Sequence, residues 1–158
     1  MIDAPSLSDF CAEMQRLAGI IEARTEFLPH CGGPDRGGLR VELEGGATYL
    51  LIHSEKGVAD VLARSADADT VMEQVFVQIT ERMAAEDLSS NEPAIEVQDL
   101  VLPSTGEARA SAMQLQNDSG ELQLRLMGRL NAEWGRRQAE RNAARAYEIQ
   151  HFFNGSRP

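Results

Sequence analysis

The stretch from Ala68 to Glu86 places the tightest constraint on how this chain can fold. Its apolar residues recur every three to four positions, a spacing that predicts a helix with one buried face. Asp67 or Asp69 could cap the start of this helix, because a short side-chain oxygen accepts hydrogen bonds from free backbone N–H groups there. The apolar stripe consists of Val71, Met72, Val75, Phe76, Ile79 and Met83. The sequence therefore predicts a core helix against which the other elements must pack.

Three further stretches have helical spacing. The first is expected over 7–23, where Ser6 and Asp9 resemble a capping box with Asp in place of Glu. A short helix is predicted over 107–116 and another over 118–130, although alternating leucines in the latter would also fit a strand. The last helix is predicted to begin after a cap at Asn131 and to run to about Phe152.

Between the first two helices, the sequence predicts a three-stranded antiparallel meander. The expected strands cover residues 39–43, 47–53 and 58–64, separated by the turns Glu44–Gly46 and Ser54–Gly57. Such a meander normally packs one face on helices. The predicted fold class is therefore α+β: a three-stranded antiparallel meander packed against several α-helices, in a single domain over residues 1–158. Residues 89–106, interrupted by Pro93 and Pro103, are predicted to form a functional loop or an unrecognised element.

Cysteine usage and the N-terminus predict a cytoplasmic protein. The first residues have neither the basic nor the apolar region of an export signal, and no apolar run approaches the roughly 18 residues of a membrane span. Cys11 and Cys31 are therefore expected to be reduced thiols without a disulfide. Adjacent His30 and Cys31 are weak evidence for zinc, because structural sites use paired ligands at short spacing. Neither a metal nor a cofactor is expected.

Charge points to the kind of partner. Residues 1–100 contain 19 acidic and 7 basic residues, a net charge of −12, whereas residues 101–158 contain 6 and 8, a net charge of +2. This acidity repels nucleic acid and anionic membranes and attracts a basic protein, although solubility alone would also explain it. The candidate contact residues, all expected to be exposed, are Glu42, Glu44, Asp67, Asp69, Glu73 and Glu81.

Two other stretches compete with this acidic surface as the contact region. One is the 89–106 segment. The other is an arginine stripe on the last helix, formed by Arg137, Arg141 and Arg145. The alanines of that helix, Ala139, Ala143 and Ala146, predict close packing against a neighbouring helix.

Several short sequence motifs resemble those of one family of bacterial proteins. They are the glycine-rich segment before the meander, Val75-Phe76 with Thr80, and the run Leu130-Asn131-Ala132-Glu133-Trp134-Gly135-Arg136-Arg137. Over roughly residues 29–138 the chain resembles the immunity protein 63 family of polymorphic toxin systems. The resemblance implies a protein that binds and neutralises a co-encoded bacterial toxin, and it supplies no catalytic residues.

The histidines do not favour an enzyme. His30, His53 and His151 fall in different predicted elements without a serine or cysteine partner pattern, so no catalytic residue is predicted. An alternative to the immunity function is a non-catalytic homo-oligomeric adaptor or a secretion chaperone. The neighbouring gene would discriminate, because a large toxin with a trafficking domain favours immunity.

Overall fold

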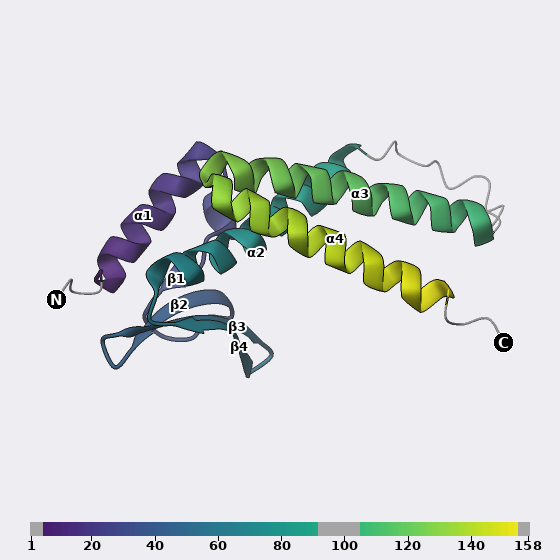
Figure 1. The fold of residues 1–158 in the computed structure, drawn as a ribbon. Coiled ribbons are helices and arrows are strands. Elements are labelled where there is room, and N and C mark those ends of the chain that lie inside the picture. Colours follow the sequence, from purple (N-terminus) through teal and green to yellow (C-terminus); the bar gives the residue numbers. More distant parts are fainter. Residues whose placement is uncertain (1–4, 92–104, 155–158) are drawn as a thin grey trace. The chain divides into compact units, whose positions relative to one another are not determined.

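The computed structural model describes the backbone of residues 5–91 and 105–154 and the side chains of residues 5–89 and 117–151. The chain divides into two compact units, residues 1–80 and 81–158. Each unit is described by itself (Figure 1). The middle of the predicted 89–106 segment lies outside the described residues, and its two ends belong to helices.

The first unit begins with helix α1 (Leu7–Ile20), followed by the short 3-10 helix η1 (Thr25–Phe27). The predicted capping box is confirmed: the Ser6 hydroxyl accepts from the Asp9 backbone N–H at 3.2 Å, and the Asp9 carboxylate accepts from the Ser6 N–H at 3.1 Å. The helix ends earlier than expected, because Glu22 adopts a positive φ of 57° that the α-helix does not allow.

A four-stranded mixed sheet follows, in the order β1 (His30–Cys31), β2 (Gly38–Glu44), β3 (Thr48–Glu55) and β4 (Val58–Ser65). The predicted antiparallel meander is confirmed for β2–β4, but the three-stranded description is wrong. β1 adds a parallel pair, with His30 opposite Arg40 and Cys31 opposite Val41. A strand of two residues, between Pro29 and Gly32, is too short to show the alternation of apolar and polar residues by which a strand is recognised.

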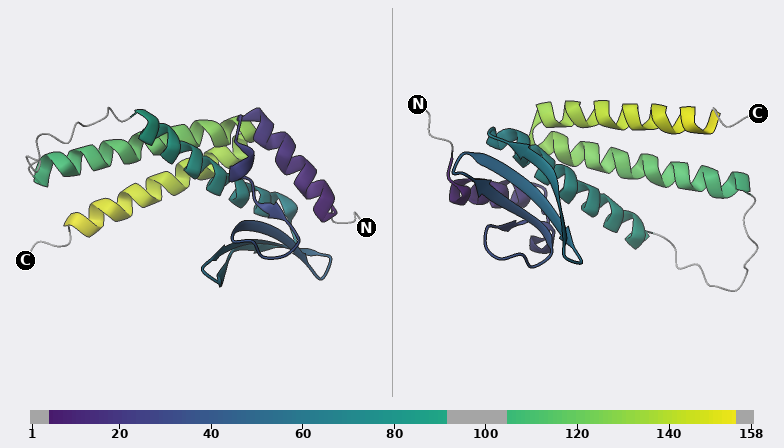
Figure 2. Two further views of the ribbon diagram at one scale, coloured as in Figure 1. Left: turned by 180° about the vertical axis from the view of Figure 1, so that it is seen from behind. Right: turned by 90° about the horizontal axis from the view of Figure 1, so that it is seen from below.

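The faces of this sheet follow from its register, because residues paired across antiparallel strands point to the same side. Val41, Leu51 and Tyr49 lie on the inner face, where the Tyr49 ring stacks on Phe10 of α1 with centroids 5.0 Å apart. Figures 1 and 2 show α1 and the first half of α2 on this side of the sheet. No helix of residues 5–80 lies on the opposite, outer face in these views.

Helix α2 (Ala68–Asn91) starts in the first unit and continues into the second. Asp67 is its cap, since its carboxylate accepts from the backbone N–H groups of Asp69 and Thr70 at 3.3 and 3.2 Å. The predicted apolar stripe is buried at all positions except Met83, which is partly exposed. The prediction of a core helix is therefore confirmed.

The second unit contains the helical hairpin of α3 (Thr105–Leu130) and α4 (Ala132–Asn154). The sequence predicted two helices where α3 is continuous, so Asp118 is an interior residue rather than a cap. The predicted cap of α4 is confirmed, because the Asn131 side chain accepts from the Glu133 N–H at 2.9 Å. No helix among the described residues has the length and apolar character needed to cross a membrane.

Polar side chains join the two arms of this hairpin. The buried Gln138 of α4 donates to the Gln123 side chain of α3 at 3.1 Å and to Asn142 at 2.9 Å. Asn142 in turn donates to the backbone carbonyl of Gly120 at 3.3 Å. Buried polar groups that satisfy one another favour a single register of the two helices.

The prediction that Cys11 and Cys31 are free thiols is wrong, because the two residues form a disulfide. The bond joins α1 to β1 across 20 residues, with the two Cα atoms 6.3 Å apart. Sequence reasoning judged these cysteines by export signal and spacing, and neither criterion reveals that parallel pairing of β1 brings Cys31 beneath α1.

Candidate protein-binding surface

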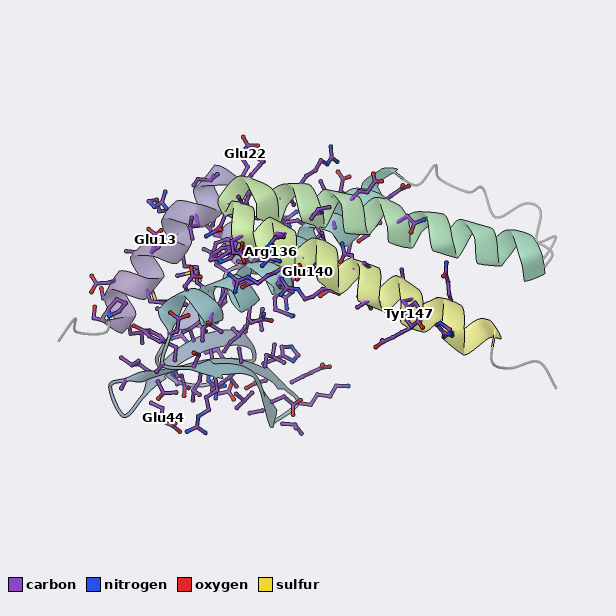
Figure 3. All side chains as sticks on the ribbon, in the orientation of Figure 1. Glu13, Glu22, Glu44, Arg136, Glu140 and Tyr147 are labelled. Carbon is purple, nitrogen blue, oxygen red and sulfur yellow. A yellow bond between two sulfur atoms is a disulfide. The ribbon has the colours of Figure 1, made fainter. Side chains whose placement is uncertain are left out.

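The structure separates the six acidic residues proposed as a contact surface. Glu42 and Glu44 lie on the outer face of the sheet, since both are on β2 in register with Leu50 and Thr48. Glu42 pairs with Arg40 at 2.7 Å, and Glu44 pairs with Arg64 of β4. Figure 3 shows Glu44 on the side of the sheet away from α1. Each carboxylate has an arginine partner, so this face is nearly balanced in charge.

Asp67 and Asp69 follow the end of β4, at the same end of the sheet as Glu44. Both are exposed, although Asp67 is engaged in capping α2. Glu81 is exposed but belongs to the second unit. The proposed residues therefore do not form one described surface.

The prediction that Glu73 is exposed is wrong, because only 3% of its surface is exposed. It was expected on the wet face of α2 from its position opposite the apolar stripe. The helix is buried around more of its circumference than the stripe indicates: Thr80, also polar, is fully buried and donates its hydroxyl to the Phe76 carbonyl at 2.7 Å. Glu73 is not available for contact with a partner on a free surface.

The centre of the outer face is apolar and is flanked by charged residues. Leu50 and Ile52 of β3 are buried there, beside Arg40, whose side chain is only 14% exposed. Arg40 also pairs with Asp35 at 3.0 Å and donates to the Ser54 hydroxyl at 2.6 Å. These contacts hold the mostly buried guanidinium in place on the outer face.

The Asp35 carboxylate is the most extensively hydrogen-bonded acid on this face. The Gly37 backbone N–H donates to it at 2.9 Å and is the main reason that its pKa is lowered. The Ser54 hydroxyl and the charge of Arg40 lower this pKa further. Asp35 therefore stays ionised and fixes the position of Arg40.

Strand β4 carries the most exposed apolar side chains of the sheet. Val58, Val61 and Leu62 are 64, 57 and 42% exposed, and they make up three of the five exposed large hydrophobic residues described. Val61 is in register with Ile52, so it continues the apolar centre of the outer face toward the edge. Val58 pairs with Glu55, so by the same register it points to the inner side, whereas Leu62 is the extra residue of a register shift. We call Val61, with the ion pairs Arg40–Glu42 and Arg64–Glu44 on the same face, the outer sheet surface.

Sequence reasoning missed this surface because it treated β4 as an ordinary two-faced strand. The register shifts between Leu51 and Ile52, so that Leu62 is an extra residue on β4. The spacing of Val58, Val61 and Leu62 departs from strict alternation, and this departure was the available signal. An edge strand rich in apolar residues is typical of a surface that a partner covers.

The second unit has a separate cavity of about 570 Å³, lined by side chains of α2, α3 and α4. Arg145 of the predicted arginine stripe lines it, together with Asp118, Glu121 and Ile149. Arg141 instead donates to the Gln138 side chain at 3.0 Å, so part of the stripe supports the hairpin. The mixed lining favours neither an apolar nor a strongly charged ligand.

The three histidines remain on separate elements. His30 is on β1, His53 is on β3, and His151 of α4 contacts Tyr147 with ring centroids 4.1 Å apart. Within the described residues no three His, Cys, Asp or Glu side chains gather as metal ligands would.

No protein-family model, curated protein or solved structure matches the chain.

Proposed function

We propose that this chain is an immunity protein, which binds a cognate bacterial toxin and neutralises it by protein–protein interaction. The observation that carries the proposal is the outer sheet surface, where Val61 is 57% exposed at the edge of an apolar centre and ordered ion pairs lie on the same face. The resemblance of residues 29–138 to an immunity family supports the same function.

The composition of this surface is that of a protein interface. Interfaces have an apolar centre and a polar rim whose charged groups set orientation. Covering the exposed Val61 side chain removes apolar area from water, at about 25 cal/mol per Å². The two arginine–glutamate pairs lie on the same face as Val61 and offer hydrogen-bonding groups to a partner. In this proposal apolar burial supplies affinity, and the ion pairs set the orientation of the partner.

Electrostatics favour a basic toxin. Residues 1–80 contain 13 acidic and 6 basic residues, a net charge of −7, and this field acts beyond the contact itself. Long-range attraction mainly accelerates association, while the close contacts determine how slowly the complex dissociates. A toxin with a basic surface would therefore associate quickly and with strong dependence on salt.

The alternative, a homo-oligomeric adaptor, uses the same strand. β4 is the last strand of the sheet, and its outer edge is unpaired among the described strands. A second copy could cover the exposed valines there. Sedimentation of the purified chain separates the two functions, since the immunity function expects a monomer that becomes a heterodimer with toxin.

A point substitution tests the proposed surface. Val61→Asp places a charge on the exposed apolar part of this surface and should weaken binding to the toxin by tenfold or more. The matched control is Tyr147→Asp on α4, also a large exposed apolar residue, which should change affinity less than twofold. The toxin is first identified by pull-down from the native strain and mass spectrometry, and affinity is then measured by calorimetry. Equal affinities of the two variants would remove the outer sheet surface as the binding site.

A further inference from the structure

The Cys11–Cys31 bond connects two elements that have few other links. β1 has only two residues, and its described pairing with the sheet comprises the two register positions opposite Arg40 and Val41. One backbone bond continues the pairing, from the Gly32 N–H to the Val41 carbonyl at 2.9 Å. A strand of this length is marginal, so the covalent bond to α1 supplies much of what holds it in place.

The position of the disulfide makes it accessible to reductants. Cys31 is exposed and Cys11 is partly exposed, so a thiolate from solvent can attack Cys31. In the cytoplasm, glutathione and thioredoxin keep such exposed cysteines reduced. Secretory compartments and the periplasm preserve the bond.

The cysteine inventory favours a permanent cross-link over a thiol switch. The chain has two cysteines in all, and both are in this bond. Disulfide exchange within the chain would require another thiol as a resolving partner. The bond has no such partner and joins a helix to a sheet edge, as a structural cross-link does.

We propose that this protein works in an oxidising compartment, where Cys11–Cys31 permanently fastens β1 and the 21–29 connection to α1. The expectation of reduced cysteines was deduced from a cytoplasmic location, and the disulfide contradicts that deduction. If the immunity function is also correct, the toxin is one encountered outside the reducing cytoplasm. The compartment itself is inferred from the disulfide alone and does not depend on toxin binding.

The redox state in the native host is the first test. Cells are quenched in acid, free thiols are blocked with a maleimide reagent, and the full-length chain is analysed by mass spectrometry. The proposal expects no blocked cysteine in the chain. Two blocked cysteines in the freshly quenched cells would overturn it, whatever the protein binds.

The structural role is tested by thermal unfolding with and without dithiothreitol. Reduction should lower the midpoint of the native protein by roughly 6–12 °C, from the loop that the bond closes. The Cys11→Ser/Cys31→Ser double variant is the matched control, and its midpoint should not respond to the reductant. An unchanged midpoint of the native protein after verified reduction would overturn the fastening role.

Discussion

Gly135 of α4 lies directly against Gly128 of α3. A Cβ atom on Gly135 would fall 2.9 Å from the Gly128 Cα and 3.2 Å from its backbone nitrogen. No flexible side chain is available to move aside, because both contacts are to backbone atoms. The close approach of α3 and α4 next to the turn between them therefore depends on a residue without a side chain at position 135.

Gly135→Ala should accordingly destabilise the protein by roughly 1–3 kcal/mol, since the helices must separate to admit a methyl group. Gly128→Ala is the matched control, because a Cβ there meets nothing within 4 Å. It should be neutral or stabilising by up to about 1 kcal/mol through helix propensity. Urea denaturation of both variants measures the difference. Equal stability of the two would mean that the helices do not approach as closely as described.

Phe76 provides a test of the central helix. Its side chain is fully buried in α2, so Phe76→Ala should cost roughly 3–5 kcal/mol through lost burial and a residual cavity. Val58→Ala on the exposed edge strand should change the free energy of unfolding by less than about 0.5 kcal/mol. A loss below about 1 kcal/mol for Phe76→Ala in chemical denaturation would contradict a central role for α2.

Glu73 and Asp69 differ in burial although both belong to the first half of α2. Glu73→Lys places a new charge in a buried position and should cost roughly 2–5 kcal/mol. Asp69→Lys at the exposed first turn should cost only about 0.3–1 kcal/mol through the helix dipole. Thermal unfolding of the pair decides whether position 73 is buried, and similar losses would argue that it is not.

The capping box predicts a specific acid titration. The Ser6 hydroxyl, followed by the Ser6 backbone N–H, lowers the pKa of Asp9 below its usual 3.8. A lowered folded pKa means that this contribution to stability is present above pH 3.8 and is lost as the pH falls through the folded value. Ser6→Ala should raise the pKa of Asp9 toward 3.8, as measured by carboxyl NMR titration.

Glu133 is the internal control for that titration. Hydrogen bonds from Arg136 lower the pKa of Glu133. Both residues belong to the second unit, whereas Ser6 belongs to the first, so the pKa of Glu133 should not change in Ser6→Ala. A pKa of Asp9 that is the same in both proteins would show that the capping box does not form in solution.

The local elements of this fold could be predicted from the sequence because their signals are local. Ser6 and Asn131 form the predicted caps, and the spacing of Val71, Val75 and Ile79 correctly indicated a buried helix. Strand β1 could not be recognised, since its two residues become a strand only through pairing with Arg40 and Val41.

Contacts between distant residues account for the remaining differences. The prediction of close packing along the alanines of α4 is wrong for Ala143 and Ala146, which are both exposed, and the close approach lies instead at Gly135. Periodicity shows which face of a helix is apolar, but not how much of its polar face a neighbour will cover, as Glu73 illustrates. The extra residue Leu62 on β4 likewise arises from a register shift that only strand pairing creates.

That register shift also limits what the edge of the sheet can do. With Leu62 inserted, the outer rim of β4 is divided into runs of four and three residues, Val58–Val61 and Ala63–Ser65. Neither run is long enough to template the continuous backbone pairing from which fibres grow, and the local twist turns them out of line. The register shift thus makes the edge of β4 a poor template for pairing with a long strand of another chain.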